Sequence, residues 1–339
     1  MTATYRVGAA GLSHDHVWGE LNHWKAAGNV VLAAAADPDP ALLEQFQAAF
    51  SDARVYRDYH EMLEKEELQF VQAAAGNSEG ANIVEAAAAR GLHVVSEKPM
   101  AATLDQATRM RNAAARAGTL LLVNWPTAWS AAWQELERRV LAGDIGEPRH
   151  TRYRSAHSGP IDIGCSPQFV HNLITPEING AGALMDYCCY GADLAARLLG
   201  RPMAVTGMRG WFGDEQAYAA SDDSAVIVAQ YAHAFGVCEA SWCQPVETIE
   251  ANPLVYGSEG AIGVVRGELV VSHRGKQRET VLPLPTEAPR RSAAEYIIYL
   301  AENRAAAEGF CSPEVSLVAQ EILELGLRAA NTGLRQPLS

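Results

Sequence analysis

The sequence lacks any apolar run close to the roughly 20 residues that a membrane-spanning helix needs. Its amino end also lacks the ordered basic, apolar and small-residue segments of a secretory signal, so we predict a cytoplasmic protein with no membrane partner. Cysteine is sparse: the six thiols form neither a C-x-x-C pair nor a zinc-type spacing. A chain of this length needs no disulfide framework, so we expect reduced thiols.

Positive charge is also scarce. Lysine and arginine number 27 against 40 aspartates and glutamates, which gives a formal net charge of −13. Such a surface repels nucleic acids and anionic membranes, so we expect neither as a partner and predict a small-molecule ligand. The 339 residues contain no repeat or low-complexity tract and are enough for two domains, each with its own core.

Residues 1–124 alternate between short apolar runs and segments with helical periodicity. This order predicts an α/β domain with a doubly wound parallel sheet, the Rossmann architecture that binds dinucleotides. The expected strands are residues 6–10, 30–36, 70–75, 92–95 and 119–123, and the expected helices include residues 40–50, 81–90 and 103–117. Each strand ends in polar or glycine residues, and ligands bind at these carboxyl ends.

Residues 125–339 have a different character. After a helix at 130–141, strands follow one another through tight turns, which predicts an α+β domain with a large, mainly antiparallel open sheet. The expected strands are residues 150–154, 204–209, 224–231, 234–242, 252–256, 261–266, 268–273 and 279–284. Residues 181–199 and 313–331 are expected to be helices, and the second of these is free to pack back on the first domain.

The first strand-to-helix turn fits a dinucleotide fingerprint in part. Gly11 keeps the first glycine of G-x-G-x-x-G, Ser13 takes the second position and His16 the third. With Leu12 and His14, these residues form the expected phosphate contacts of a cofactor. We discount a metal site at the two histidines, since no acidic or cysteine partner is fixed by the sequence.

Asp37 ends the next strand, where an acid can accept hydrogen bonds from the adenosine ribose. No arginine occurs in residues 38–40 to neutralise a 2′-phosphate, which favours NAD over NADP. Asp37 also suits a turn or helix cap before Pro38, and both roles can hold together.

Glu97 and Lys98 end another strand and precede Pro99, which restricts them to an extended or turn geometry. This stretch is either a reactive strand end or an ordinary charged surface loop. Trp125 follows the last strand of the first domain, and its spacing with Trp129 and Trp133 is typical of a buried helical stripe. At a strand end, Trp125 can also wall a substrate site.

Three polar residues share one face of the helix at 181–199: Asp186, Tyr190 and Asp193. The rest of that helix is apolar, so a polar stripe facing the first domain favours a site over a solvated face. The connection at 157–180 is long for a compact domain unless it is functional. We expect His157 and Asp162 there to contact the substrate, although a plain surface excursion fits nearly as well.

Taken together, Asp37, Glu97-Lys98-Pro99, the Gly-Ala-Leu-Met-Asp186 helix and the turn at 257–260 resemble the Gfo/Idh/MocA oxidoreductase family. The tyrosine at 190 is similar to the branch that carries tyrosine in place of the catalytic histidine. The resemblance implies that Lys98 binds substrate and acts in catalysis with Tyr190, Glu97 lies beside it, and Asp186 orients the substrate. Lys98 would then have to lower the pKa of Tyr190, which is ordinarily near ~10.

The resemblance further implies NAD-dependent hydride transfer at a secondary hydroxyl carbon of a sugar or polyol. It also implies a homodimer or homotetramer formed through the second sheet. Two alternatives from the same family stay open: tightly bound NAD used in a transient oxidation that cleaves glycosides, and a non-catalytic NAD- or sugar-binding regulator. Asn77 lies at the expected cofactor lip, where residues 76–80 depart from the family's Pro-x-x-x-His, and residues 124–129 lack the familiar arginine.

Overall fold

The computed structural model describes residues 4–213, 218, 221–246 and 248–338. The first domain contains a six-stranded parallel sheet in the order β3-β2-β1-β4-β5-β6, which confirms the predicted Rossmann architecture. Its strands are β1 Tyr5–Ala10, β2 Val30–Ala36, β3 Arg54–Tyr56, β4 Phe70–Ala73, β5 His93–Glu97 and β6 Leu121–Asn124. Its helices are α1 Val17–Ala26, α2 Pro40–Ala49, α3 Tyr59–Lys65, α4 Gly80–Ala88 and α5 Leu104–Ala117.

Local sequence signals explain where these helices begin and end. Asp39 caps α2 by accepting a hydrogen bond from the Ala41 backbone, and Thr103 and Gln106 form a reciprocal capping box at the start of α5. Gly118 ends α5 with a φ of 67°, a conformation that favours glycine. The sequence analysis missed β3, because three partly exposed residues at a sheet edge carry little periodic signal.

The second domain is built on a nine-stranded sheet in the order β14-β13-β12-β11-β7-β10-β9-β8-β15. All of its strand pairs are antiparallel except β10 with β7, so the predicted mainly antiparallel sheet is confirmed. The strands are β7 Pro148–Ala156, β8 Ala204–Gly210, β9 Ser224–Gln230, β10 Phe235–Ser241, β11 Leu254–Gly257, β12 Gly260–Val265, β13 Glu268–His273, β14 Glu279–Val281 and β15 Gln336–Pro337.

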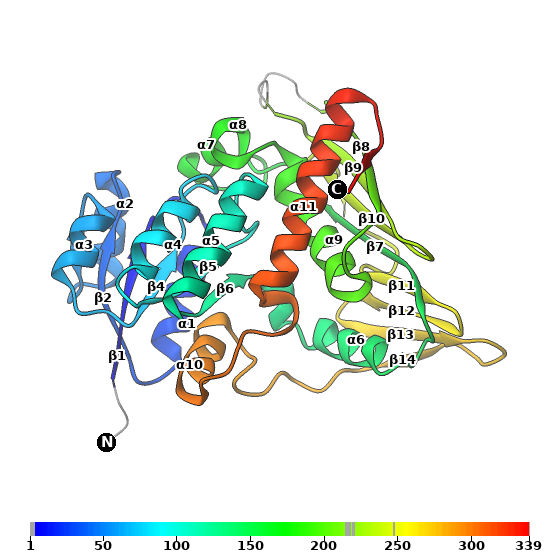
Figure 1. Cartoon of the computed structure of the whole chain (residues 1–339), viewed down its shortest axis with the longest axis horizontal. Helices are drawn as coiled ribbons and strands as arrows, with labels where there is room; N and C mark the ends of the chain where they lie inside the picture. Colours follow the sequence, from blue (N-terminus) through cyan, green and yellow to red (C-terminus); the bar gives the residue numbers. More distant parts are fainter. Residues whose placement is uncertain (1–3, 214–217, 219–220, 247, 339) are drawn as a thin grey trace.

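Helices cover one face of this sheet, whereas the other face has no helical layer among the described residues (Figure 1). The covering helices are α6 Ala131–Leu141, α9 Ala183–Leu199 and α11 Pro313–Thr332. Helix α9 lies directly on β7 and β10. Gly191 makes this approach possible, because a Cβ there would overlap Cys238 of β10.

Helix α11 lies between the two domains. Its Gln320 and Glu324 side chains accept hydrogen bonds from the backbone of Ala101 and Leu104 in the first domain. A helix that the sequence analysis missed, α10 Ala293–Asn303, packs against α1. The C-terminal segment therefore fixes the Rossmann sheet against the second domain. None of the described helices is long and apolar enough to cross a membrane.

The connection at 157–180 is partly helical, which corrects the expectation of a loop. It contains α7 Pro167–Ile174 and α8 Pro176–Asn179, each opened by a proline at its first position. Ser166 caps α7 by accepting a hydrogen bond from the Phe169 backbone. Two short 3-10 turns, η1 Pro126–Trp129 and η2 Gly309–Cys311, complete the described elements.

Candidate active site

Lys98 and Asp186 form a buried ion pair at the junction of the two domains. Lys98 directly follows the last residue of β5, and Asp186 lies in the first turn of α9. The Lys98 Nζ is 2.7 Å from the Asp186 Oδ1. Both side chains are almost completely buried. Burial lowers the pKa of the Lys98 ammonium, but Asp186, Tyr190 and Cys189 together outweigh burial, and the pKa lies well above its usual value. The pair therefore presents a fixed positive charge beside a fixed carboxylate.

Tyr190 is one turn further along α9 and lies under the same ammonium. The Lys98 Nζ is 4.9 Å from the centre of the Tyr190 ring. The expectation that Lys98 brings the pKa of Tyr190 down is wrong, because burial raises that pKa and the opposing effect of Lys98 does not offset it. Tyr190 is therefore a neutral phenol, suited to giving a proton rather than to carrying a negative charge.

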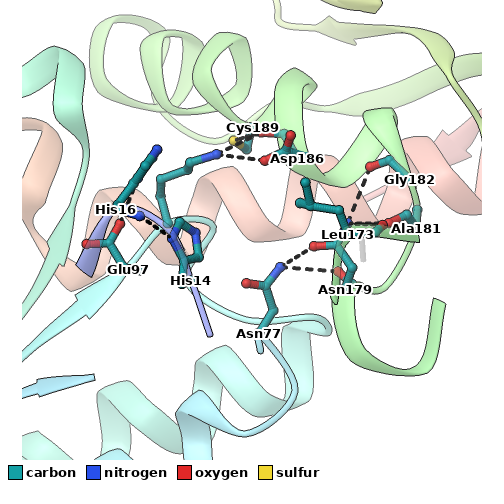
Figure 2. A network of polar contacts seen from close by, with 11 residues as sticks. His14, His16, Asn77, Glu97, Leu173, Asn179, Ala181, Gly182, Asp186 and Cys189 are labelled. Carbon is teal, nitrogen blue, oxygen red and sulfur yellow. Dashed lines mark hydrogen bonds and ion pairs between the residues drawn. The ribbon is translucent and has the colours of Figure 1, made fainter. Parts of the chain in front are cut away.

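Glu97 connects the strand end to the first turn of the Rossmann domain. One of its oxygens accepts a hydrogen bond from Asn124 at 2.8 Å, and the other is 3.2 Å from Nδ1 of His16. His14 lies beside these two residues. One ring nitrogen of His14, one of His16 and a carboxylate oxygen of Glu97, the atoms that could bind a metal ion, lie within 4.8 Å of one another (Figure 2). The sequence analysis found no acid near the histidines, because Glu97 is distant in the sequence. Burial lowers the pKa of His14 well below its usual value, so that ring is neutral.

The predicted cofactor turn is held by Asp37. The Leu12 backbone donates to one Asp37 oxygen at 2.7 Å, and the Asp39 backbone donates to the other at 2.8 Å. Gly11 has a φ of 85°, and a Cβ there would overlap the backbone of Ala75. Asp37 thus fills the structural turn role, and each of its oxygens keeps a second lone pair for a ribose hydroxyl.

A cavity of about 560 Å³ opens beside this turn. Gly11, Ser13 and Asp37 line it on the first-domain side, as expected for the adenosine half of a dinucleotide site. Arg57 also lines it, although residues 38–40, where a partner for a 2′-phosphate was expected, contain no arginine. Arg57 directly follows β3, and because β3 runs parallel to β2, the two strands end at the same edge of the sheet. A sequence reading that included β3 would have placed Arg57 there.

His157 lies at the second-domain side of the ion pair. The His157 and Tyr187 rings pack edge-on, with their centres 4.8 Å apart. Burial lowers the pKa of His157, because the opposing effect of Asp186 does not offset it and Lys98 lowers it further. Its Nδ1 accepts a hydrogen bond from the Gly159 backbone at 2.8 Å. A neutral His157 therefore carries its proton on Nε2, where it can donate to a substrate oxygen.

Two expected substrate contacts do not reach this site. Trp125 is buried, donates its indole N–H to Ser316 of α11, and packs edge-on behind Tyr190 at 5.9 Å. Asp162 is exposed and lines a separate cavity with Trp242. Trp125 therefore supports Tyr190 from behind, and Asp162 has no described contact with the Lys98–Asp186 pair.

Asn77, expected at the cofactor lip, lies in the turn after β4, and its amide donates to Asn179 of α8 at 2.6 Å (Figure 2). The sequence analysis did not find Asn179, because an asparagine ending a four-residue helix carries no recognisable motif. Asp193, the third residue of the predicted polar stripe, is buried with no hydrogen-bond partner among the described residues. Burial raises the pKa of Asp193 well above its usual value.

Comparison with known proteins agrees with this geometry. Residues 7–125 match the family model described as "Oxidoreductase family, NAD-binding Rossmann fold", and residues 133–263 match the GFO/IDH/MocA C-terminal domain. Together the two matches span more than half of the chain. A solved NAD binding oxidoreductase from Klebsiella pneumoniae has the same fold, with a TM-score of 0.82 and 21% identity over 100% of both chains.

Curated relatives are dehydrogenases. D-apiose dehydrogenase of Paraburkholderia graminis is 34% identical over 152 residues, which are 44% of this chain and 40% of that protein. The match thus spans about two fifths of the length of that relative. Myo-inositol 2-dehydrogenase of Thermotoga maritima is 24% identical over 76% of this chain and 74% of its own. This chain belongs to the Gfo/Idh/MocA oxidoreductase family, and its first domain is an NAD-binding Rossmann domain.

Proposed function

We propose that the protein is an NAD(H)-dependent oxidoreductase acting on a secondary hydroxyl carbon of a sugar, sugar derivative or polyol. The observation that carries this proposal is the buried Lys98–Asp186 pair at the carboxyl edge of an NAD-binding sheet. The names of the apiose and inositol dehydrogenase relatives support the substrate class. The Lys98 ammonium, the Asp186 carboxylate and the Tyr190 phenol lie side by side, so a sugar or polyol with adjacent hydroxyl groups can hydrogen-bond to all three.

Each group has a chemical task in this proposal. The Lys98 ammonium binds the reacting hydroxyl oxygen and stabilises the negative charge that develops there. Asp186 accepts a hydrogen bond from a neighbouring hydroxyl and fixes which carbon faces the cofactor. Tyr190 exchanges the hydroxyl proton, and His157 donates from Nε2 to a further oxygen. The nicotinamide, when bound, accepts or supplies the hydride.

The cofactor is assigned to the turn and strand ends of the first domain. Gly11, Leu12, Ser13, His14 and His16 surround the phosphate position in this proposal. Asp37 takes the adenosine ribose, whereas Asn77, Glu97 and Lys98 border the nicotinamide end. Asp37 favours NAD because a 2′-phosphate would face its carboxylate, and Arg57 at the same cavity moderates that preference.

The test is a titration with NADH and NADPH followed by a substrate screen. We expect energy transfer from tryptophan to the reduced nicotinamide, with tighter binding of NADH, and NADH formation when NAD is supplied with pentoses, hexoses or cyclitols. A protein that binds NADH but reduces NAD with no member of the panel would favour the regulator. Binding of neither nucleotide would contradict the proposal.

One structural observation also favours the tightly bound NAD alternative. Helix α7 lies across the cofactor edge, and its Asn172 donates to Ser13 in the phosphate turn at 2.9 Å. A helix packed against the phosphate turn beside a bound cofactor would slow its release. Denaturing the purified protein and measuring released NAD distinguishes this alternative, because retained NAD with no net NADH production supports it.

We also propose that two copies pair through the face of the nine-stranded sheet that has no helical layer. Met208 of β8, Phe235 of β10 and Tyr256 of β11 are exposed there at outward positions of their strands. Exposed apolar side chains spread over one face of a sheet are typical of subunit interfaces. We expect a dimer or tetramer in light scattering, and Met208→Asp to lower the mass; a monomer at micromolar concentration would contradict this.

A further inference from the structure

The segment from Cys165 to Gly180, which contains α7 and α8 and is called the strap here, leaves the second domain and lies against the first. Figure 1 shows α7 and α8 beside the upper ends of α4 and α5, apart from the nine-stranded sheet. The strap begins shortly after His157 and ends directly before the helix that carries Asp186. Both of its ends are therefore continuous with proposed substrate-binding residues.

Hydrogen bonds join the strap to the strand ends where a dinucleotide binds. They start from four positions along the strap and reach the turns after β1, β2 and β4. The pairs are Ser166 with Asp15 at 2.8 and 2.5 Å, Gln168 with Asp39 at 2.9 Å, Asn172 with Ser13 at 2.9 Å, and Asn179 with Asn77 at 2.6 Å. The strap thus occupies polar groups of the cofactor turn that would otherwise face a ligand.

Apolar packing fills the other half of the site. The Phe169 ring lies 4.4 Å from the His14 ring, and Ile178 packs so closely on Gly76 that a Cβ there would overlap it. Beside Lys98 the remaining space is about 10 Å³, about the minimum that one water molecule requires. The adenosine side keeps about 560 Å³. A nicotinamide within hydride-transfer distance of a substrate at Lys98 has no room while the strap is in this position.

We propose that the strap is a gate for the cofactor: it covers the nicotinamide half of the site and must lift before a dinucleotide can bind there. This inference rests on the proposed function, because it takes the cleft beside Lys98 as the hydride-transfer site.

The gate predicts how the rate of NADH binding depends on the NADH concentration. When the strap must open first, the rate of NADH association levels off at high NADH concentration, because opening becomes limiting. Removing one latch hydrogen bond is expected to raise the limiting rate about fivefold, the usual effect of one such bond. Because the closed strap leaves no room for the nicotinamide, the same change raises the open fraction, so the Kd should fall by a similar factor and the dissociation rate should stay near that of the parent. A simple loss of a cofactor contact would raise the dissociation rate alone.

Two variants test the gate without removing any polar side chain: one displaces the strap, and the other removes the cause of the displacement. Gly76→Ala places a methyl group against Ile178 and is expected to displace the strap, whereas Gly76→Ala/Ile178→Ala removes the obstruction again. Stopped-flow energy transfer from tryptophan to NADH should show a limiting rate raised at least fivefold in the single variant and near the parent value in the double variant. Ile178→Ala alone and Glu177→Gln, an exposed change on α8, are the matched controls.

Hydrogen exchange gives a second readout that does not depend on the cofactor. Backbone amides of residues 166–180 should exchange faster in Gly76→Ala and recover in the double variant, with β1 and β4 unchanged as evidence of an intact fold. NADH binding with a linear concentration dependence in every protein, and unchanged strap exchange, would overturn the gate and leave the proposed function standing. Absence of NADH and NADPH binding even in Gly76→Ala and Asn172→Ala would overturn both.

Discussion

Replacing Lys98 by methionine is expected to lower kcat/KM by roughly 10²–10⁴ on any sugar or polyol that the protein oxidises. Methionine keeps most of the side-chain volume but removes the ammonium, so the developing charge on the reacting oxygen loses its stabilisation. Lys98→Arg should restore only part of the rate, because a planar guanidinium does not fit the space of an ammonium bonded at 2.7 Å. Steady-state kinetics with saturating NAD measure both effects.

The same change leaves Asp186 buried without its partner. Breaking a buried ion pair by removing one member costs about 3–5 kcal/mol, so Lys98→Met should also unfold at a lower temperature. Lys98→Met/Asp186→Asn removes the unpaired charge and should recover most of that stability without recovering turnover. If the double variant regained activity together with stability, the lysine would be a structural residue and its catalytic assignment would be wrong.

The pairing of Lys98 with Asp186 shows what the sequence was able to predict. Each residue follows a recognisable local signal: a β-branched strand stopped by proline in one case, a polar stripe on an apolar helix in the other. Strand ends of a parallel sheet meet at one edge, and a helix with a polar stripe turns it toward that edge. Two local patterns therefore placed both residues in one expected site, although the contact between them, across 88 positions of the sequence, was not itself predicted.

The parts that were missed depend on contacts without a local signal. Of the two roles considered for Trp125, the structure shows the buried one and not the substrate wall, because Ser316, 191 residues away, accepts its indole hydrogen bond and holds the ring inside. The strap was expected to be a loop, because an eight-residue and a four-residue helix show too few turns for periodicity. Arg57 follows a three-residue strand that was not predicted at all. In each case a partner distant in the sequence determines the position.

Tyr190 is the second residue whose replacement should have a large effect. Tyr190→Phe is expected to lower kcat/KM by roughly 10²–10⁴, since a positioned proton donor or acceptor contributes about this much. Phenylalanine keeps the packing against Trp125 and the Lys98 ammonium above the ring, so binding of NADH and the thermal stability should stay near those of the parent. Losses in turnover with unchanged NADH affinity separate proton transfer from a structural role.

The pH dependence of the two reaction directions tests whether Tyr190 donates and accepts the proton. Burial raises the pKa of Tyr190, so the phenol keeps its proton across about pH 6 to 9, where the reductive rate should not fall because of this group. In the oxidative direction only the ionised fraction accepts a proton, and below the pKa that fraction grows about tenfold per pH unit. The oxidative kcat/KM of the parent should therefore rise through this interval, and the rise should vanish in Tyr190→Phe. An unchanged slope in the variant would contradict the assignment of the proton exchange to Tyr190.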